Sequence, residues 1–425
     1  MADLERSKVT LGIIPLVDCA PIVLAEELGA FERHGLEVEI CREASWATIR
    51  DKVALGLLDA AQMLAPMPLA STLGIDGISV PMVAAMTLDL NGNAITLSQS
   101  LWREIEEAAP ELTGENLAIG TPLDARALAA VVRRRAAAGR PPLALASVFP
   151  FSSHNYLLRL WLAAGGMDPD RDVRLSVVPP PHTVAHLSGG VIDGYCVGEP
   201  WNQQAVSVGI GRIAVTGHQI WKAMPEKVLG TTESWAQCHP KTLIALIKAL
   251  IEACAWLDEP ANRREAARVL ASPRYVNAPV EVIERSMSGG YLFAQDGVPV
   301  ALPDFHIFHR QAANFPWRSH ADWFLEQMVR WGQADPAVNL RAVADRVFRC
   351  DIYRAAASEL ALPCPTSDRK LEGAHAHPWI LQTNGRPIAM APDDFLDGSV
   401  FDPSSSPVKQ DAPARDPMRD HPGKF

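Results

Sequence analysis

The sequence predicts an α/β protein in which two lobes enclose a ligand cleft and a helical region follows. Strand and helix patterns alternate through the first half of the chain, which is typical of mostly parallel sheets. A second block of the same kind interrupts the first, as expected when one lobe is inserted into another. Helical periodicity then dominates the last third of the chain. A ligand of such a protein lies near the carboxyl ends of the strands, and hinge bending closes the lobes around it.

The first block contains short apolar runs and amphipathic segments. Residues 36–40 alternate apolar and charged side chains, as a half-buried strand does, and the helical pattern before them ends at Gly35. No glycine-rich phosphate-binding motif follows a strand, so a dinucleotide or P-loop site is not expected. The predicted strands are 8–14, 36–40, 59–64, 80–86 and 93–98, and the predicted helices are 21–35 and 46–56.

The second block repeats this alternation. Leu157, Leu158 and Trp161 recur at the spacing of one helix face. Three prolines at 179–181 end the strand before them. The predicted strands are 116–121, 143–148, 173–178 and 193–197, and the predicted helices are 123–139, 154–166 and 183–190.

After Glu199 the chain is expected to return to the first lobe. The proline-rich end of the chain, from about residue 396, is predicted to be a disordered tail. The predicted organisation is 8–95 for the first part of lobe I, 96–198 for lobe II, 199–395 for the second part of lobe I with C-terminal helices, and 396–425 for the tail. The predicted strands are 212–217 and 227–237, and the predicted helices are 240–258, 262–271, 320–332 and 342–360.

Composition narrows the class of protein. Hydrophobic residues make up 48% and charged residues 21%, which is ample for buried cores. The net charge of −10 argues against direct nucleic-acid binding, which needs a basic face. No secretory leader and no membrane span are predicted, so a cytoplasmic location is expected. The seven cysteines are scattered without CxxC spacing, as free thiols in a reducing compartment would be.

Enzyme and metal motifs are absent from the sequence. It holds no HExxH, GxSxG or zinc-type cysteine pattern. His182 and His186 lie at i, i+4 and could face one metal, although two surface histidines are the simpler interpretation. Ser153 and His154 are adjacent, but adjacency does not make a catalytic pair, which needs through-space geometry. The sequence therefore predicts a binding protein that is not an enzyme and needs no cofactor or metal.

Five long segments of the chain carry a resemblance to a known family. The segments are ASWATIRDKVALGLLDAAQMLAPMPLA (44–70), LDLNGNAITLS (88–98), HNYLLRLWLAAGGMDPDRDVRL (154–175), DGYCVGEPWNQQAV (193–206) and HQIWKAMPEKVLG (218–230). On these segments the chain resembles the NrtA/CmpA-type nitrate- and bicarbonate-binding proteins of ABC transporters and, more closely, their cytoplasmic relatives, the NasS-type nitrate sensors. The resemblance covers residues 8–395 and implies the type II periplasmic-binding-protein fold with nitrate or nitrite as ligand.

The resemblance also implies the residues that contact the anion: Trp46, Asn93, His154 and Lys227. Asn93 stands where the transporter proteins carry the longer glutamine. Nitrate is a planar anion without a proton, so a site made only of donors suits it. His154 opens a predicted helix, where the helix dipole favours an anion. Bicarbonate needs an acceptor for its hydroxyl, so a lysine at 227, instead of an acid, favours nitrate.

Further residues are expected to shape the cleft: Gln62, Gly198, Glu199 and Trp201. The resemblance also implies a partner, a NasT-like antiterminator with an RNA-binding ANTAR domain, which the sensor holds when empty and releases when nitrate binds. The alternative is a nitrate- or bicarbonate-capturing protein of an ABC transporter. The thiamin-pyrimidine synthases, enzymes that resemble this superfamily, need a CCCFC-type motif that the sequence lacks.

Overall fold

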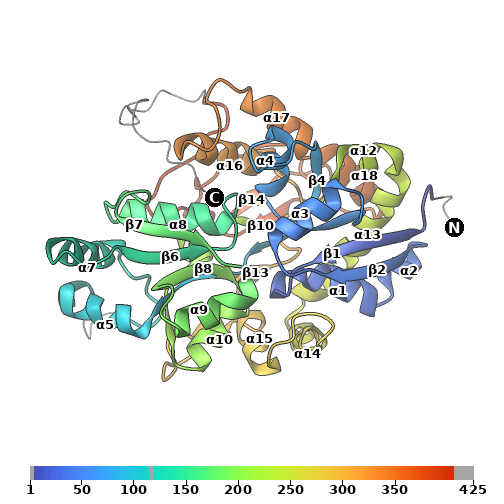
Figure 1. Ribbon diagram of the computed structural model, residues 1–425. Helices are drawn as coiled ribbons and strands as arrows, with labels where there is room; N and C mark the ends of the chain where they lie inside the picture. The colour runs from blue at the N-terminus through green and yellow to red at the C-terminus, as the bar shows by residue number, and fades with distance from the viewer. Residues whose placement is uncertain (1–3, 114–117, 406–425) are drawn as a thin grey trace.

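The computed structural model describes residues 4–113 and 118–405 of the 425-residue chain, and it divides them into two α/β lobes (Figure 1). The sheet of lobe I has the strand order β13-β4-β10-β3-β1-β2, and the sheet of lobe II has the order β7-β6-β8-β5-β9. This is the bilobal periplasmic-binding-protein fold that the sequence predicts. Figure 1 shows the lobe II strands in green and cyan beside the blue strands of lobe I, with helices around each sheet.

Lobe I combines parallel and antiparallel strands. Strand β1 pairs with β2 and β3 in parallel, whereas β10 lies antiparallel between β3 and β4. The strands are β1 (Lys8–Ile13), β2 (Glu37–Arg42), β3 (Ala60–Leu64), β4 (Met82–Asn91), β10 (Pro225–Thr232) and β13 (His306–Ile307). Its helical elements before the crossing into lobe II are η1 (Val17–Cys19), α1 (Ala20–Glu27), α2 (Ala30–Arg33), α3 (Trp46–Ala54) and α4 (Met67–Leu73).

Lobe II is built around β6, which pairs in parallel with β7 and β8. Its strands are β5 (Asn93–Ser98), β6 (Leu143–Ser147), β7 (Val173–Val177), β8 (Gly194–Gly198) and β9 (Gly211–Thr216). Its helical elements are α5 (Gln99–Ala108), α6 (Pro110–Thr113), α7 (Ala125–Ala137), α8 (Ser153–Ala164), η2 (Pro180–His182), α9 (Thr183–Ser188), α10 (Trp201–Ser207) and α11 (Gly217–Ile220).

The chain crosses between the lobes twice. Strand β4 passes almost directly into β5 through Gly92, whose φ of 84° brings the backbone close to His306. A Cβ on Gly92 would lie 2.1 Å from Cε1 of His306, so no larger residue fits here. The second crossing follows Thr216, because β9 pairs with β5 in the lobe II sheet. The predicted return at residue 199 is therefore too early.

The rest of the chain is mainly helical and packs on both lobes. Helix α13 buries Leu243, Leu246, Ile247 and Leu250 at helical spacing against α1 and α18. Phe324 of α16 reaches Tyr156 of α8 in lobe II, with ring centroids 6.0 Å apart. The elements are α12 (Glu233–Cys238), α13 (Pro240–Asp258), η3 (Pro260–Asn262), α14 (Arg263–Leu270), α15 (Val280–Met287), β11 (Gly290–Tyr291), β12 (Val300–Ala301), α16 (Arg318–Arg330), α17 (Leu340–Val347), α18 (Cys350–Glu359), β14 (Trp379–Leu381) and β15 (Ile388–Met390).

Three predicted elements differ from the structure. The helix predicted over 21–35 is two helices, since Gly29 adopts a φ of 67° between them. The helix predicted over 342–360 breaks at Phe348, which is extended and bridges to Ala84. The strand predicted over 227–237 ends at Thr232, whose side chain caps α12.

Two further predictions concern the ends of elements and the thiols. The strand predicted over 116–121 falls partly outside the described residues, and residues 118–121 form no strand. Most of the predicted tail also lies outside the described residues. All seven cysteines are free thiols. Within the part of the chain that the structure describes, no helix combines the length and the apolar character needed to cross a bilayer.

Candidate functional site

The four residues expected to contact the anion lie together at the junction of the lobes. Lobe II contributes Asn93 at the start of β5 and His154 in the first turn of α8. Lobe I contributes Trp46, the first residue of α3, and Lys227 from β10. Each side chain is buried, and His154, Asn93 and Lys227 are 0% exposed. The lobes therefore meet around these residues and shield them from solvent.

Local sequence explains why two of these residues stand at helix starts. Ser45 caps α3 by accepting a hydrogen bond from the backbone N–H of Thr48 at 3.2 Å. Ser152 caps α8 in the same way, with its Oγ 3.0 Å from the backbone nitrogen of Asn155. Trp46 and His154 each follow one of these caps, so both side chains begin a helix that faces the junction.

The carboxylate of Glu226 occupies the centre of the cluster. Its Oε1 lies 2.8 Å from Nε2 of His154 and also pairs with the ammonium of Lys227. The amide of Asn93 donates to its Oε2 at 2.8 Å, and the hydroxyl of Ser153 donates to the same oxygen. Four side chains from both lobes thus converge on one carboxylate, which the sequence analysis did not identify.

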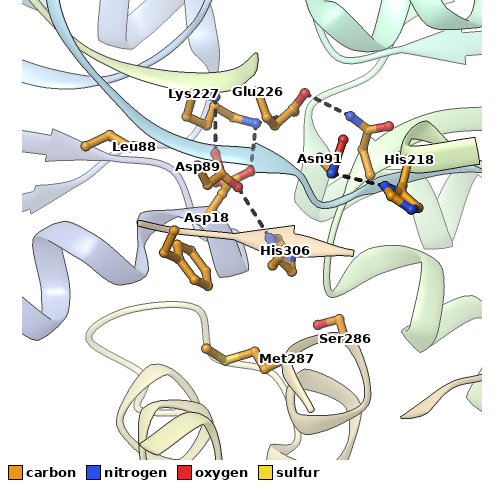
Figure 2. A network of polar contacts seen from close by, with 12 residues as sticks. Asp18, Leu88, Asp89, Asn91, His218, Glu226, Lys227, Ser286, Met287 and His306 are labelled. Atoms are coloured by element: carbon orange, nitrogen blue, oxygen red, sulfur yellow. Dashed lines mark hydrogen bonds and ion pairs between the residues drawn. The ribbon is translucent and has the colours of Figure 1, made fainter. Parts of the chain in front are cut away.

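Two further carboxylates surround Lys227. Its Nζ lies 2.7 Å from Oδ2 of Asp18, and its backbone N–H donates to Oδ1 of Asp89 at 3.2 Å. Oδ2 of Asp89 is 3.3 Å from Nδ1 of His306. Figure 2 shows Asp18 and Asp89 directed toward Lys227, with His306 beyond Asp89. The ammonium also lies 5.4 Å from the ring centroid of Trp46, within cation–π range.

Burial and pairing shift the protonation of these groups in opposite directions. Burial raises the pKa of Asp18 to about 6 and that of Asp89 well above its usual value, although Lys227 opposes both shifts. Burial would also raise the pKa of Glu226, but His154 and Lys227 outweigh it and lower that pKa. Burial lowers the pKa of Lys227, but Asp18, Glu226 and Asp89 outweigh burial and raise it. Lys227 is therefore a cation and Glu226 an anion at neutral pH.

His306, at the edge of this cluster, is affected mainly by burial. Burial lowers its pKa to about 3, and the field of nearby Arg263 and Lys227 acts in the same direction. The neutral ring of His306 therefore adds no positive charge beside Asp89 at neutral pH.

Several buried polar atoms at the cluster have spare bonding capacity. Among the described residues, the indole N–H of Trp46, Oδ1 of Asn93 and Nδ1 of His154 have no hydrogen-bond partner. Nε2 of His154 lies close to Glu226 but forms no well-aligned hydrogen bond with it. Because unpaired buried polar atoms are costly, these donors and acceptors indicate a place that suits a small polar ligand.

The expected cleft residues lie around the cluster without joining its donors. Gln62 accepts from the backbone N–H of Ile14 at 2.9 Å and donates to Asp18, so it orients the acid that pairs with Lys227. A Cβ on Gly198 would lie 3.1 Å from Oδ2 of Asp18 and 3.7 Å from Nε2 of His154. The backbone of β8 therefore forms one wall of the site.

Glu199 and Trp201 connect lobe II to other parts of the molecule. Tyr291 donates to Oε1 of Glu199 at 2.5 Å, and the indole N–H of Trp201 donates to the carbonyl of Pro15 at 3.2 Å. The backbone N–H of Val17 donates to the carbonyl of Glu199 at 2.7 Å. These contacts join the lobes beside the cluster.

The expectation of a site made only of donors is wrong, because Asp18, Asp89 and Glu226 are all part of it. A charged residue inside the apolar run IIPLVDCAPIV is a sequence pattern that could have identified Asp18. No group of metal-ligating residues forms among the described parts of the chain. The rings of His182 and His186 meet edge-on, and His182 is exposed, so the simpler surface interpretation of this pair fits.

Comparisons with known proteins identify relatives of this chain. The family model described as NMT1-like matches residues 2–271. The chain is similar to the nitrate import ATP-binding protein NrtC of Synechocystis sp., with 41% identity over 374 residues, 88% of this chain and 52% of that protein. It is 34% identical to the nitrate/nitrite binding protein NrtA of Synechococcus elongatus over 412 residues, 94% of this chain and 85% of that protein.

A solved structure resembles the whole chain. It is the periplasmic nitrate-binding protein NrtA from Synechocystis PCC 6803, with a TM-score of 0.80 and 31% identity, covering 94% of this chain and 96% of that one. By contrast, the chain spans about half the length of NrtC.

Proposed function

The chain belongs to the NrtA/CmpA-type family of nitrate- and bicarbonate-binding proteins, and we propose that it is a nitrate or nitrite sensor that controls a protein partner. The sensor acts in the cytoplasm and holds an antiterminator of the NasT type, with an RNA-binding ANTAR domain, until the anion binds. Seven free thiols suit a reducing compartment. The net charge of −10 suits a protein that leaves RNA binding to its partner.

The observation that carries the proposal is the set of donors that converges from both lobes. Asn93 and His154 of lobe II and Lys227 of lobe I all contact Glu226. Trp46 of lobe I lies beside Lys227, and its indole N–H is unpaired among the described residues. A planar monoanion bound here contacts both lobes at once. Its binding energy therefore favours the conformation in which the lobes touch.

The sensor mechanism follows from linkage. If the partner prefers the separated lobes and the anion prefers the closed ones, each weakens the binding of the other by the same factor. To shift the protein almost completely to the closed state, the anion has to bind that state about 5.5 kcal/mol more tightly than the state with separated lobes. A micromolar ligand binds with about −8 kcal/mol in total, so most of that energy has to depend on closure.

The names of the relatives concern import and binding. NrtC, at 41% identity, is named as an ATP-binding protein of nitrate import, and NrtA, at 34%, as a nitrate/nitrite binding protein. None of these names describes an enzyme that converts nitrate.

Thermal unfolding with a panel of anions tests the ligand. Nitrate or nitrite at about 1,000 times its Kd adds roughly 4 kcal/mol, which raises Tm by about 4–5 °C for a chain of this length. Lys227→Ala and His154→Ala are expected to abolish the shift. Lys370→Ala is the matched control, because Lys370 also pairs with a buried carboxylate, that of Glu372, away from the site. An unchanged Tm in both nitrate and nitrite contradicts the proposal that one of these anions is the ligand.

The sensor role needs a separate measurement. Nitrate added to the complex of this protein with a NasT-like antiterminator is expected to dissociate it, as followed by size-exclusion chromatography. A complex that persists at saturating nitrate contradicts the sensor role and leaves anion binding intact.

Capture of nitrate or bicarbonate for an ABC importer is the second candidate function. The carboxylate of Glu226 favours it in one respect, since a buried acceptor suits the hydroxyl of bicarbonate. A Tm shift with bicarbonate and none with nitrate or nitrite supports this candidate.

A further inference from the structure

The Glu226 carboxylate lies among the donors that are proposed to bind the anion. We infer that the Glu226 carboxylate is a built-in occupant of the anion site, that nitrate displaces it, and that Glu226 takes up one proton when this happens. The inference rests on the proposed anion ligand and adds a residue that determines which anion binds.

The geometry makes Glu226 a substitute for the ligand. A carboxylate is a planar group with one negative charge, as nitrate is, and it presents two oxygens where nitrate presents three. Its two oxygens already engage four groups that would serve a bound anion: His154, Lys227, Asn93 and Ser153. A second anion that binds these donors has to remove Glu226 from them.

Simple coexistence of the two anions is unfavourable. Two like charges about 4 Å apart repel by about 4 kcal/mol at the effective dielectric typical of proteins. The acids that surround Lys227 add to this cost, because Asp18 and Asp89 also contact it. Three carboxyl groups therefore already share the one lysine of the cluster.

Displacement therefore changes the protonation of Glu226. The titratable groups that face it are His154 from α8, Lys227 from β10, Asp18 from η1, Asp89 from β4 and His306 from β13, with the Cys196 thiol of β8 nearby. His154 and Lys227 keep its pKa low, against the effect of burial. Once nitrate engages these two groups, burial dominates and favours the protonated acid.

The proton also explains a preference among anions. Protonated Glu226 becomes a donor, which suits nitrate because nitrate only accepts hydrogen bonds. Bicarbonate carries its own hydroxyl, so an ionised Glu226 can accept from it and no proton is needed. Nitrate binding is therefore linked to proton uptake, and its affinity rises as the pH falls, by up to tenfold per pH unit.

Isothermal titration calorimetry measures this proton directly. Sodium nitrate is titrated into the full-length protein at pH 7 in phosphate and in Tris, which differ in ionisation enthalpy. We expect the difference in binding enthalpy to correspond to about one proton taken up. The Kd, measured from pH 6 to pH 8, is expected to rise close to tenfold per unit.

Two variants test whether the proton uptake depends on Glu226 or on the loss of any buried carboxylate. Glu226→Gln imitates the protonated acid, so its nitrate affinity should be independent of pH and at least tenfold tighter than wild type at pH 8. Glu372→Gln is the matched control, since Glu372 is also fully buried and contacts a serine, a lysine and a histidine away from the site. It should retain the proton uptake.

The outcomes distinguish this inference from the proposed function. Nitrate binding with no proton uptake in wild-type protein overturns the role of Glu226 and leaves the anion sensor intact. Binding by Glu226→Gln but not by wild type at pH 8 supports the inference. Absence of nitrate binding in both proteins overturns the inference and the nitrate ligand together. The wild-type proton count decides the question if Glu226→Gln does not fold.

Discussion

The Lys227 ammonium lies 2.7 Å from Oδ2 of Asp18, and both side chains are fully buried. This ion pair joins the strand that follows the second crossing between the lobes to the turn that follows the first strand of the chain. Gln62 fixes Asp18 from the other side. The cation proposed to hold the anion is therefore positioned by groups that never contact solvent.

Removal of the Lys227 charge is expected to destabilise the fold strongly. Lys227→Met leaves Asp18, Glu226 and Asp89 buried without their common cation, which costs about 3–5 kcal/mol of unfolding free energy. Urea denaturation at pH 7.5 measures the loss. Lys248→Met is the control, because Lys248 pairs with the half-exposed Glu359 and should cost less than about 1 kcal/mol. Equal losses in the two variants would contradict the charge balance described for the cluster.

The indole N–H of Trp46 is expected to donate a hydrogen bond to the ligand and to contribute little to the stability of the fold. Trp46→Phe retains most of the buried ring and removes a donor that has no partner among the described residues. A hydrogen bond to a charged ligand contributes about 1.5–3 kcal/mol, so nitrate affinity should fall about tenfold or more. Calorimetry measures the affinity, and urea denaturation should show a much smaller change than Trp46→Ala, which creates a cavity. Unchanged affinity in Trp46→Phe argues against contact between the indole N–H and nitrate.

A glycine beside Asn93 is expected to control the position of its amide. A Cβ on Gly217 would lie 2.2 Å from Oδ1 of Asn93, so Gly217→Ala displaces that side chain. We expect about tenfold weaker nitrate binding by calorimetry. In Gly290→Ala the nearest atom is 3.8 Å away, so this control should bind normally. Normal binding in both variants would show that Asn93 is not needed at its present position.

The stability of the protein is expected to depend on pH through Glu199. Burial raises the pKa of Glu199 from 4.5 to about 7, against the opposing bonds from Tyr291 and Gln203. The native state therefore keeps a proton that the unfolded chain has lost, and the unfolding free energy falls as the pH rises from about 4.5 to 7. The loss is on the order of 3 kcal/mol. Glu199→Gln should remove this part of the pH profile, measured by urea denaturation.

Glu372 is expected to change the unfolding free energy with pH in the opposite direction to Glu199. Burial opposes ionisation of Glu372, but Lys370 and His320 outweigh it and lower its pKa to about 2. Its contribution to stability is therefore present above pH 4.5 and is lost as the pH falls toward 2. For Glu199, the contradicting result is an unfolding free energy of Glu199→Gln that falls with pH between 4.5 and 7 as much as that of the wild type.

Much of the fold follows from local patterns in the sequence. The alternation in β2 predicts a half-exposed strand, and the apolar periodicity of α8 and α13 predicts helices that pack on the core. The breaks at Gly29 and Phe348 depend on tertiary contacts or on a positive φ, which periodicity does not reveal. The predicted return to lobe I at residue 199 is too early because β9 pairs with β5 in the lobe II sheet, and the pattern of a strand does not show which sheet it joins.

The acids of the site could not be read from their spacing. Neighbouring residues of a strand point to opposite faces, so Glu226 would be expected to point away from Lys227. The pairing of β10 with β4 shifts register on both sides of Lys227, and such an irregularity redirects side chains. Glu226 and Lys227 therefore meet in the same cluster. Asp89 belongs to a continuous buried strand, where only the three-dimensional pairing shows which side chain faces Lys227.

The two crossings between the lobes have an evolutionary consequence. Asn93 begins immediately after the first crossing, and Glu226 and Lys227 lie in the strand that follows the second. A substitution at these positions therefore changes the cluster and the backbone that joins the lobes at the same time. In the proposed sensor, anion selectivity and the response to the anion would evolve together for this reason.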